Sequence, residues 1–318
     1  MDEQLKLAKE KLKKFHQEQV LIKYDTMSQE NKEKLVKQIL SLNFEQLEEL
    51  YEMAKKEVAV EEAKIEPIAY VDKEKMTKEE KEEYKKIGVE SIKNGELAAV
   101  TMAGGQGTRL GHKGPKGTFD LGLDSHKSIF EILCDTLKKA KEEYGVVIPW
   151  YLMTSKENNE ETIQFFESHN YFGYPKESIH FFMQGELPML LENGHIVLKE
   201  DGTIKEAADG HGGVFESMTR NGIVEQMKEN GIKWVFIGGV DNVLVKMVDP
   251  ILIGLTIKKN ALAAGKSVVK ANPSERVGVF CKKNGKPSVI EYTEISKEMA
   301  EATDSSRRTS IWRISYFV

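Results

Sequence analysis

Residues 97–118 read LAAVTMAGGQGTRLGHKGPKGT, an apolar run that ends abruptly in a loop rich in glycine. The run from Leu97 to Met102 has the length and composition of a buried parallel strand. Glycines expose successive backbone N–H groups without a side-chain barrier, and Arg109 and Lys116 add two positive charges to the same loop. The stretch therefore predicts a strand followed by a phosphate-binding loop. A glycine-rich surface loop without a ligand is the alternative.

The spacing of the glycines separates this loop from two common phosphate-binding motifs. A Walker A loop requires Gly-Lys-Ser/Thr after a fixed gap, whereas Lys116 follows Pro115 here. A dinucleotide fingerprint requires its third glycine three residues after the second, but Gly107 and Gly111 are four residues apart. Gly114 also opposes an immediate helix start, so a nicotinamide-dependent oxidoreductase is disfavoured.

Composition narrows the class of protein. The 318 residues carry a net charge of −5, and 40% of them are hydrophobic, which is enough for a sizeable core. The acidic balance disfavours a nucleic-acid partner or an acidic membrane surface. No apolar run approaches the ~20 residues of a membrane span, and the N-terminus lacks a signal-peptide core. Cys134 and Cys281 have no paired spacing, so we expect a cytoplasmic location and no structural zinc.

The N-terminal region has a helical pattern. No proline precedes Pro67, so nothing interrupts helix formation before it. Ser28 is placed to cap one helix, and Thr77 with Glu80 forms a capping-box pattern for another. We therefore expect an N-terminal helical region and connector over residues 1–95.

The remainder alternates between strand and helix patterns. Buried strands are predicted at residues 97–102, 148–153 and 234–237, and helices at 129–144, 157–168 and 215–229. Such alternation favours a three-layer, Rossmann-like α/β fold with a mixed, mainly parallel sheet, which we expect over residues 96–300. Asn-Gly and Asp-Gly pairs within residues 191–204 predict a small hairpin inserted near the site.

Two polar residues follow predicted strands. Asp241 comes after the strand at 234–237, and ligands of parallel sheets gather beyond the carboxyl ends of the strands. Its carboxylate suits Mg²⁺ held together with substrate phosphates, although a helix cap or a turn is the alternative role. Gln184 follows another apolar run, and its amide can both donate and accept, as a pyrimidine ring does. A satisfied loop amide is the alternative there.

Two further segments are candidates for ligand contacts. Residues 209–213 read DGHGG, where Gly210 allows close backbone approach and His211 supplies a polar ring. A neutral, hydrogen-bonded histidine is the ordinary role for such a residue. Residues 290–295 read IEYTEI, in which Glu291 is either a hydrogen-bond acceptor for a ligand or an ordinary strand carboxylate.

Taken in order, these motifs resemble those of the eukaryote-type UDP-sugar pyrophosphorylases, a family of UTP:sugar-1-phosphate uridylyltransferases. The N-acetylglucosamine branch carries Ala-Gly-Gly-Gln-Gly-Thr-Arg-Leu-Gly and then Pro-Lys-Gly, similar to Ala103–Gly111 and Pro115–Gly117 here. Supporting motifs extend the resemblance from about Leu97 to Ile295. One position differs, because that branch usually has asparagine where His211 stands, whereas the glucose branch favours Gly-His-Gly.

The resemblance implies transfer of a uridylyl group from UTP to a hexose 1-phosphate, with N-acetylglucosamine 1-phosphate favoured by Gln106 and Arg109. It implies Arg109 and Lys116 as catalytic residues, Mg²⁺ at Asp241, and Gln184 as the reader of the uracil. The implied nucleotide-binding residues are Met102, Ala103, Gly104, Gly105, Lys116, Gln184, Gly210 and Asp241. The implied sugar-binding residues are His211, Glu291 and Tyr292.

Alternatives to this function stay open, namely a UDP-glucose pyrophosphorylase and a nucleotide-binding protein without turnover. No family motif is visible after Ile295, so we expect the C-terminal part of the catalytic domain to be missing. Residues 301–318 would then be a divergent tail, which a shift of reading frame would explain and the nucleotide sequence would test. The sequence contains no signal for an oligomeric state.

Overall fold

The computed structural model describes residues 2–55, 64–270, 272, 274–294 and 313–315. Contacts divide the chain into two compact units. The smaller unit comprises Met1–Glu61 and Gly185–Asp209, and the larger comprises Glu62–Gln184 and Gly210–Val318. This division differs from the predicted boundary at residue 95, because the chain leaves the larger unit at Gly185 and returns to it at Gly210.

The larger unit is built on a parallel sheet of four strands in the order β4-β3-β2-β7. Its strands are β2 (Leu97–Met102), β3 (Trp150–Thr154), β4 (Ile179–Met183) and β7 (Trp234–Gly239). The central strand β2 is buried from Leu97 to Thr101, as its apolar composition predicts. Among the described strands β7 pairs only with β2, and Val235 is 37% exposed, so this strand is less buried than predicted.

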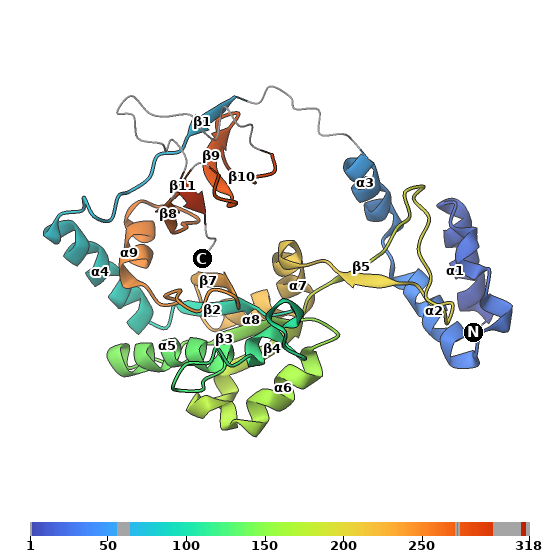
Figure 1. The fold of residues 1–318 in the computed structure, drawn as a ribbon, viewed down its shortest axis with the longest axis horizontal. Helices are drawn as coiled ribbons and strands as arrows, with labels where there is room; N and C mark the ends of the chain where they lie inside the picture. The colour runs from blue at the N-terminus through green and yellow to red at the C-terminus, as the bar shows by residue number, and fades with distance from the viewer. Residues whose placement is uncertain (1, 56–63, 271, 273, 295–312, 316–318) are drawn as a thin grey trace. The chain divides into compact units, whose positions relative to one another are not determined.

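Helices cover both faces of this sheet (Figure 1). They are α4 (Lys78–Lys93), α5 (Ile129–Tyr144), α6 (Asn159–Ser168), α7 (Val214–Arg220), α8 (Ile223–Glu229) and α9 (Pro250–Lys258). Leu97 and Ala99 of β2 share a core with α4, α5, α6 and α9, whereas Ala98 and Val100 share another with α7 and α8. Alternate residues of a strand face opposite sides, so the three-layer α/β prediction is confirmed.

Local sequence signals explain where several helices begin and end. Thr77 and Glu80 form the predicted capping box of α4, and Ser128 caps α5 by accepting a hydrogen bond from the Glu131 N–H. The single helix predicted over 215–229 is two helices, α7 and α8. They separate at Gly222, whose φ of 71° is unfavourable for other residues.

A second sheet in the larger unit pairs only antiparallel strands, in the order β1-β9-β11-β8 with β10 beside β9. Its strands are β1 (Ile65–Pro67), β8 (Ser267–Val269), β9 (Val279–Lys283), β10 (Lys286–Ile290) and β11 (Arg313–Ser315). Apart from β11, the predicted tail at residues 301–318 lies outside the described residues.

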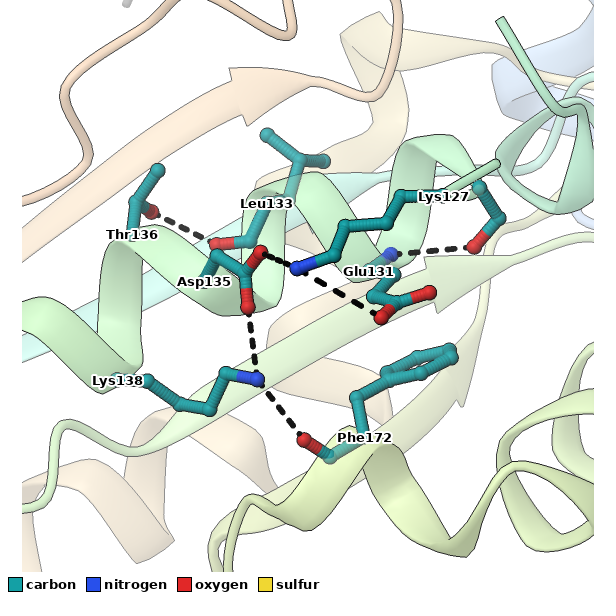
Figure 2. Close-up of polar contacts among 8 residues, drawn as sticks. Lys127, Glu131, Leu133, Asp135, Thr136, Lys138 and Phe172 are labelled. Carbon is teal, nitrogen blue, oxygen red and sulfur yellow. Dashed lines mark hydrogen bonds and ion pairs between the residues drawn. The ribbon is translucent and has the colours of Figure 1, made fainter. Parts of the chain in front are cut away.

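A charge network on α5 anchors a strained turn (Figure 2). Asp135 lies 2.6 Å from Lys127 Nζ and 2.7 Å from Lys138 Nζ, and Lys138 also donates to the Phe172 carbonyl at 3.1 Å. Phe172 belongs to the turn Asn170–Gly173, in which every residue has positive φ. Non-glycine residues rarely adopt that conformation, so the Lys138 hydrogen bond helps to hold it.

The protonation of Asp135 depends on the same network. Burial by itself raises the pKa of this carboxyl, but hydrogen bonds from Lys127 and Lys138 outweigh burial and lower the pKa below its ordinary value. The hydrogen bond with Asp135 also raises the pKa of Lys127. Both groups are therefore charged near neutral pH.

The smaller unit joins the N-terminal helices to a segment from the middle of the chain. It contains α1 (Asp2–Lys14), α2 (Gln29–Ser41), α3 (Phe44–Lys55) and the antiparallel pair β5 (Glu186–Pro188) and β6 (Glu206–Ala208). Ser28 caps α2 as predicted. Ile196 and Ile204 are buried in one core with residues of all three helices.

Two glutamines of the N-terminal region form hydrogen bonds with the backbone of the middle segment. Gln17 exchanges side-chain hydrogen bonds with the Gly194 carbonyl and the Ile196 N–H, at 2.9 and 3.0 Å. Gln38 does the same with both backbone groups of Ile204, at 3.1 and 3.0 Å. Each amide satisfies one donor and one acceptor, as a neighbouring strand would. The segment predicted as a hairpin within 191–204 forms two isolated β-bridges, Leu190–Ile196 and Leu198–Ile204, rather than a pair of strands. It packs with the N-terminal helices, although the sequence placed it in the catalytic domain.

Candidate functional site

The four parallel strands end at one edge of the sheet, where the glycine-rich loop begins. The Ala103 N–H donates to the Met153 carbonyl at 2.7 Å, and the Val240 N–H donates to the Met102 carbonyl at 3.0 Å. These hydrogen bonds continue the pairing of β2 with β3 and β7 beyond the strands. Residues just after the strands are thereby fixed relative to one another, which is the usual place for a ligand site in a parallel sheet.

The glycine-rich loop leaves the end of β2 and turns back toward it, and backbone hydrogen bonds join its two sides. The Gly107 N–H donates to the Gly114 carbonyl at 2.9 Å, and the Lys116 N–H donates to the Gly105 carbonyl at 3.0 Å. Gly114 has a φ of 128°, which favours glycine. This pairing returns Lys116 to the side of Gly105, close to the end of β2.

Lys116 and Asp241 form an ion pair across the edge. Lys116 Nζ lies 2.8 Å from Asp241 Oδ1, and their side chains are 21% and 59% exposed. The sequence predicted a phosphate-binding lysine and a metal-binding carboxylate from separate motifs, and the structure brings the two side chains into contact. The pair places a cation and a solvent-facing carboxylate beside the glycine-rich loop.

Gln184 packs directly on Gly104. A β-carbon on Gly104 would lie 2.6 Å from Gln184 Nε2 and 3.0 Å from its Oε1, so no larger residue fits without moving the amide. Gln184 is buried, and its backbone N–H donates to the Thr154 carbonyl at 2.8 Å. The two residues that the sequence predicted to contact a nucleotide are therefore adjacent, with the polar end of Gln184 against the loop.

The DGHGG segment also reaches this edge. Gly210 has φ 71° and ψ −159°, a backbone conformation essentially restricted to glycine. A β-carbon on Gly239 at the end of β7 would lie 3.7 Å from His211 Cε1. The ring of His211 is therefore close to the strand that leads to Asp241.

Three other predicted residues are exposed. Arg109 lies in a short 3-10 helix, Thr108–Leu110, and extends from the loop surface. Glu291 and Tyr292 follow β10, and the hydrogen bonds of Glu291 run to Glu294. Within the described residues none of the three forms a hydrogen bond or ion pair with the edge that carries Lys116. Their ligand roles stay predictions.

Asn158 is a site residue that the sequence analysis missed. It is fully buried just before α6, and its side-chain N–H group donates to the carbonyls of Ala103 and Gly105 at 3.0 and 3.3 Å. Its Oδ1 accepts from the Ser155 N–H at 2.8 Å. The polar residues at 154, 155 and 158, after an apolar strand, were the available signal.

The described part of the chain contains no cluster of three or more His, Cys, Asp or Glu side chains arranged to hold a metal ion. Asp241 therefore belongs to no such cluster. Magnesium commonly binds through one or two protein carboxylates and completes its shell with water and substrate phosphates, so the Asp241 carboxylate fits such an ion.

No helix in the described part is long and apolar enough to cross a membrane.

The sequence matches the family described as UTP–glucose-1-phosphate uridylyltransferase over residues 41–314. The chain belongs to this family. The match includes the glycine-rich loop, Gln184 and Asp241, and it continues to residue 314. The expectation that family resemblance stops at Ile295 is therefore wrong.

Relatives within the uridylyltransferase family carry N-acetylglucosamine names. The chain is 38% identical to UDP-N-acetylglucosamine diphosphorylase 2 of Arabidopsis thaliana over 311 residues, which cover 93% of this chain and 62% of that protein. It is 43% identical to UDP-N-acetylglucosamine pyrophosphorylase of Saccharomyces cerevisiae over 253 residues, which cover 78% of this chain and 53% of that protein. The chain thus spans less than two thirds of these relatives.

Solved structures agree with this assignment. The uridine diphosphate N-acetylglucosamine pyrophosphorylase of Trypanosoma brucei, in complex with an inhibitor, matches with a TM-score of 0.82 and 29% identity, over 98% of this chain and 65% of that one. A putative UDP-N-acetylglucosamine pyrophosphorylase of Entamoeba histolytica matches with a TM-score of 0.71 and 36% identity, over 80% and 64% of the two chains. A UDP-glucose pyrophosphorylase mutant of Leishmania major shares the fold, with a TM-score of 0.67 and 15% identity.

Proposed function

We propose that this chain forms the nucleotide-binding part of a uridylyltransferase that converts UTP and N-acetylglucosamine 1-phosphate into UDP-N-acetylglucosamine and pyrophosphate. The observation that carries the proposal is the joint placement of Gln184 on Gly104 and of Lys116 beside Asp241, at one edge of a parallel sheet. The names of the relatives at 38% and 43% identity support the choice of sugar.

The base would be read where Gln184 meets Gly104. A uracil ring presents an N–H donor between carbonyl acceptors, and an amide side chain can pair with both kinds of group. Because Gly104 has no side chain, the ring can approach the loop backbone as well as the amide. We assign Met102, Ala103, Gly104, Gly105 and Gln184 to the nucleotide-binding residues of the site.

The triphosphate would lie between the glycine-rich loop and Lys116. The sugar phosphate oxygen is already anionic when it attacks the α-phosphorus in line, so the reaction needs neither a general base nor a covalent intermediate. The protein positions the reactants and offsets the negative charge on the leaving pyrophosphate. Lys116 supplies one charge, and Arg109 on the loop surface supplies a second in this proposal.

Asp241 would hold Mg²⁺ together with the substrate phosphates. When bound, the ion would neutralise charge on the phosphates and on the departing pyrophosphate. Lys116 contacts the same carboxylate in this structure, at 2.8 Å. We therefore propose that Lys116 exchanges Asp241 for a phosphate when the nucleotide binds, which frees the carboxylate for the ion.

The sugar would be contacted by His211, Glu291 and Tyr292, with Gly210 allowing close approach of the backbone. Gln106 and Arg109 match the N-acetylglucosamine branch, whereas His211 matches the glucose branch. The second candidate function is therefore a UDP-glucose pyrophosphorylase, favoured by this histidine.

Cys134 and Cys281 are both free and buried, which supports a proposed location in the reducing cytoplasm.

A turnover assay tests the proposed function. The 318-residue protein is incubated with UTP, Mg²⁺ and a panel of sugar 1-phosphates, and pyrophosphate release is measured. We expect a higher kcat/KM for N-acetylglucosamine 1-phosphate than for glucose 1-phosphate. The reverse order would favour the second candidate, and UTP binding without pyrophosphate release would indicate a nucleotide-binding protein without turnover.

A further inference from the structure

Asn158 stands at a helix start but does not cap the helix. It is the residue before α6, where an asparagine side chain normally accepts a hydrogen bond from a backbone N–H of the first turn. Its side chain makes no such capping bond. It donates instead to the Ala103 and Gly105 carbonyls, and its Oδ1 accepts from the Ser155 N–H. The Ser155 bond fixes which end of the amide faces the loop.

The two accepted hydrogen bonds set the orientation of two peptide groups. In a trans peptide the carbonyl of one residue and the N–H of the next point in opposite directions, and the described residues contain no cis peptide. The Ala103 and Gly105 carbonyls point toward the buried Asn158. The N–H groups of Gly104 and Gln106 must therefore point away from it.

Those two N–H groups have no protein acceptor in the described part of the chain. The neighbouring Gly107 and Lys116 N–H groups are both bonded, to Gly114 and Gly105. Backbone N–H groups of a loop that face outward without a protein acceptor can donate to an anion. Lys116 lies beside them, because a β-carbon on Gly105 would be 3.8 Å from its Nζ.

We propose that Asn158 is a positioning residue, which turns the peptide groups of the glycine-rich loop so that the Gly104 and Gln106 N–H groups donate to nucleotide phosphates. It does not touch the nucleotide itself. This inference rests on the proposed function, since it concerns the same loop. It adds a buried residue from a different strand–helix connection to the phosphate site.

Substitution of Asn158 tests the proposal in the 318-residue protein. Asn158→Leu removes the donor at similar volume, and Asn158→Ala removes it with less steric demand. Thr162→Val is the matched control, because Thr162 is fully buried on α6 and its hydroxyl has no partner in the described residues. Affinities for UTP and for uridine, which has no phosphate, are measured by calorimetry and NMR titration, with thermal unfolding in parallel.

We expect both Asn158 variants to bind UTP about tenfold or more weakly, in line with loss of backbone donors to a charged group, and to bind uridine within about twofold of wild type. Thr162→Val should leave both affinities unchanged. Equal losses for UTP and uridine would reveal a merely structural role, and unchanged UTP affinity in a folded variant would also overturn the proposal. Failure of the wild-type protein to bind UTP would instead refute the proposed function.

Hydrogen–deuterium exchange gives a second test that needs no substitution. The Gly104 and Gln106 amides of the wild-type protein should exchange more slowly when UTP is bound than when uridine is bound, because only UTP supplies phosphate acceptors. Identical exchange with the two ligands, at concentrations that saturate both, would contradict the assigned orientation of these N–H groups.

Discussion

Lys116→Ala is the substitution whose effect on UTP binding can be estimated most fully from the structure. The lysine side chain is mostly buried beside the glycine-rich loop and contacts Asp241 at 2.8 Å. A hydrogen bond from a charged group contributes about 1.5–3 kcal/mol. In the absence of Mg²⁺, its removal also leaves the Asp241 carboxylate unpaired beside the triphosphate. Because Asp241 is largely solvent-exposed, screening limits that repulsion to roughly 1 kcal/mol.

Together these effects predict a loss of about 2–4 kcal/mol, a rise in the Kd for UTP of roughly 30- to 700-fold. Isothermal titration calorimetry of the 318-residue protein measures it, with thermal unfolding as a check on folding. Lys113→Ala is the matched control, because Lys113 is an exposed lysine of the same loop and should change the Kd less than about threefold. Equal effects of the two substitutions, or no effect of Lys116→Ala in a folded protein, would refute the assigned contact.

Three further substitutions test other parts of the structure. Gly104→Ala should displace the Gln184 amide and weaken UTP binding about tenfold by fluorescence titration, with little change in stability; unchanged binding would contradict their adjacency. Gly254→Ala would place a β-carbon 1.8 Å from the Tyr84 carbonyl oxygen, so urea unfolding should show a loss of about 3 kcal/mol or more; a neutral effect would contradict the close helix contact. The pKa of Asp135 is lowered in the folded protein, because hydrogen bonds from two lysines outweigh burial. The ionised carboxylate therefore stabilises the fold above the ordinary carboxyl pKa, and this stabilisation is lost as the pH falls through the folded-state pKa. Asp135→Asn should therefore destabilise the protein by about 1 kcal/mol near pH 7 and have a smaller effect near pH 3, and a difference that grows toward acid would refute this.

The central layer of the fold was predictable because its signals are local. Leu97–Met102 is an apolar run of strand length that ends in glycine, and the Thr77 and Glu80 capping box stands just before a helical pattern. The same locality placed Asp241 at the carboxyl end of β7 and Lys116 in the loop that follows the carboxyl end of β2. Parallel strands bring such ends together, and their ion pair follows from that arrangement.

Other features depend on contacts that no short motif encodes. Gln17 lies in the connection after α1 and Gln38 lies on α2, and no local motif distinguishes either residue. Each satisfies a backbone donor and acceptor of the segment at 194–204, far along the chain. Asn158 before a helix reads as a cap, and only the tertiary structure reveals that its amide faces the glycine-rich loop. For these three residues the direction of the side chain, rather than the residue type, determines which backbone groups it contacts.

The most direct test of the central claim is the affinity of the 318-residue protein for UTP compared with CTP, measured by calorimetry in the presence of Mg²⁺. Cytosine replaces one acceptor and one donor of uracil by the opposite groups, so the contacts with the loop backbone and Gln184 would be mismatched. The structure predicts at least about tenfold tighter binding of UTP, or about 1.4 kcal/mol. Equal affinity for the two nucleotides, or no binding of either, would contradict the assignment of this edge of the sheet as a UTP site.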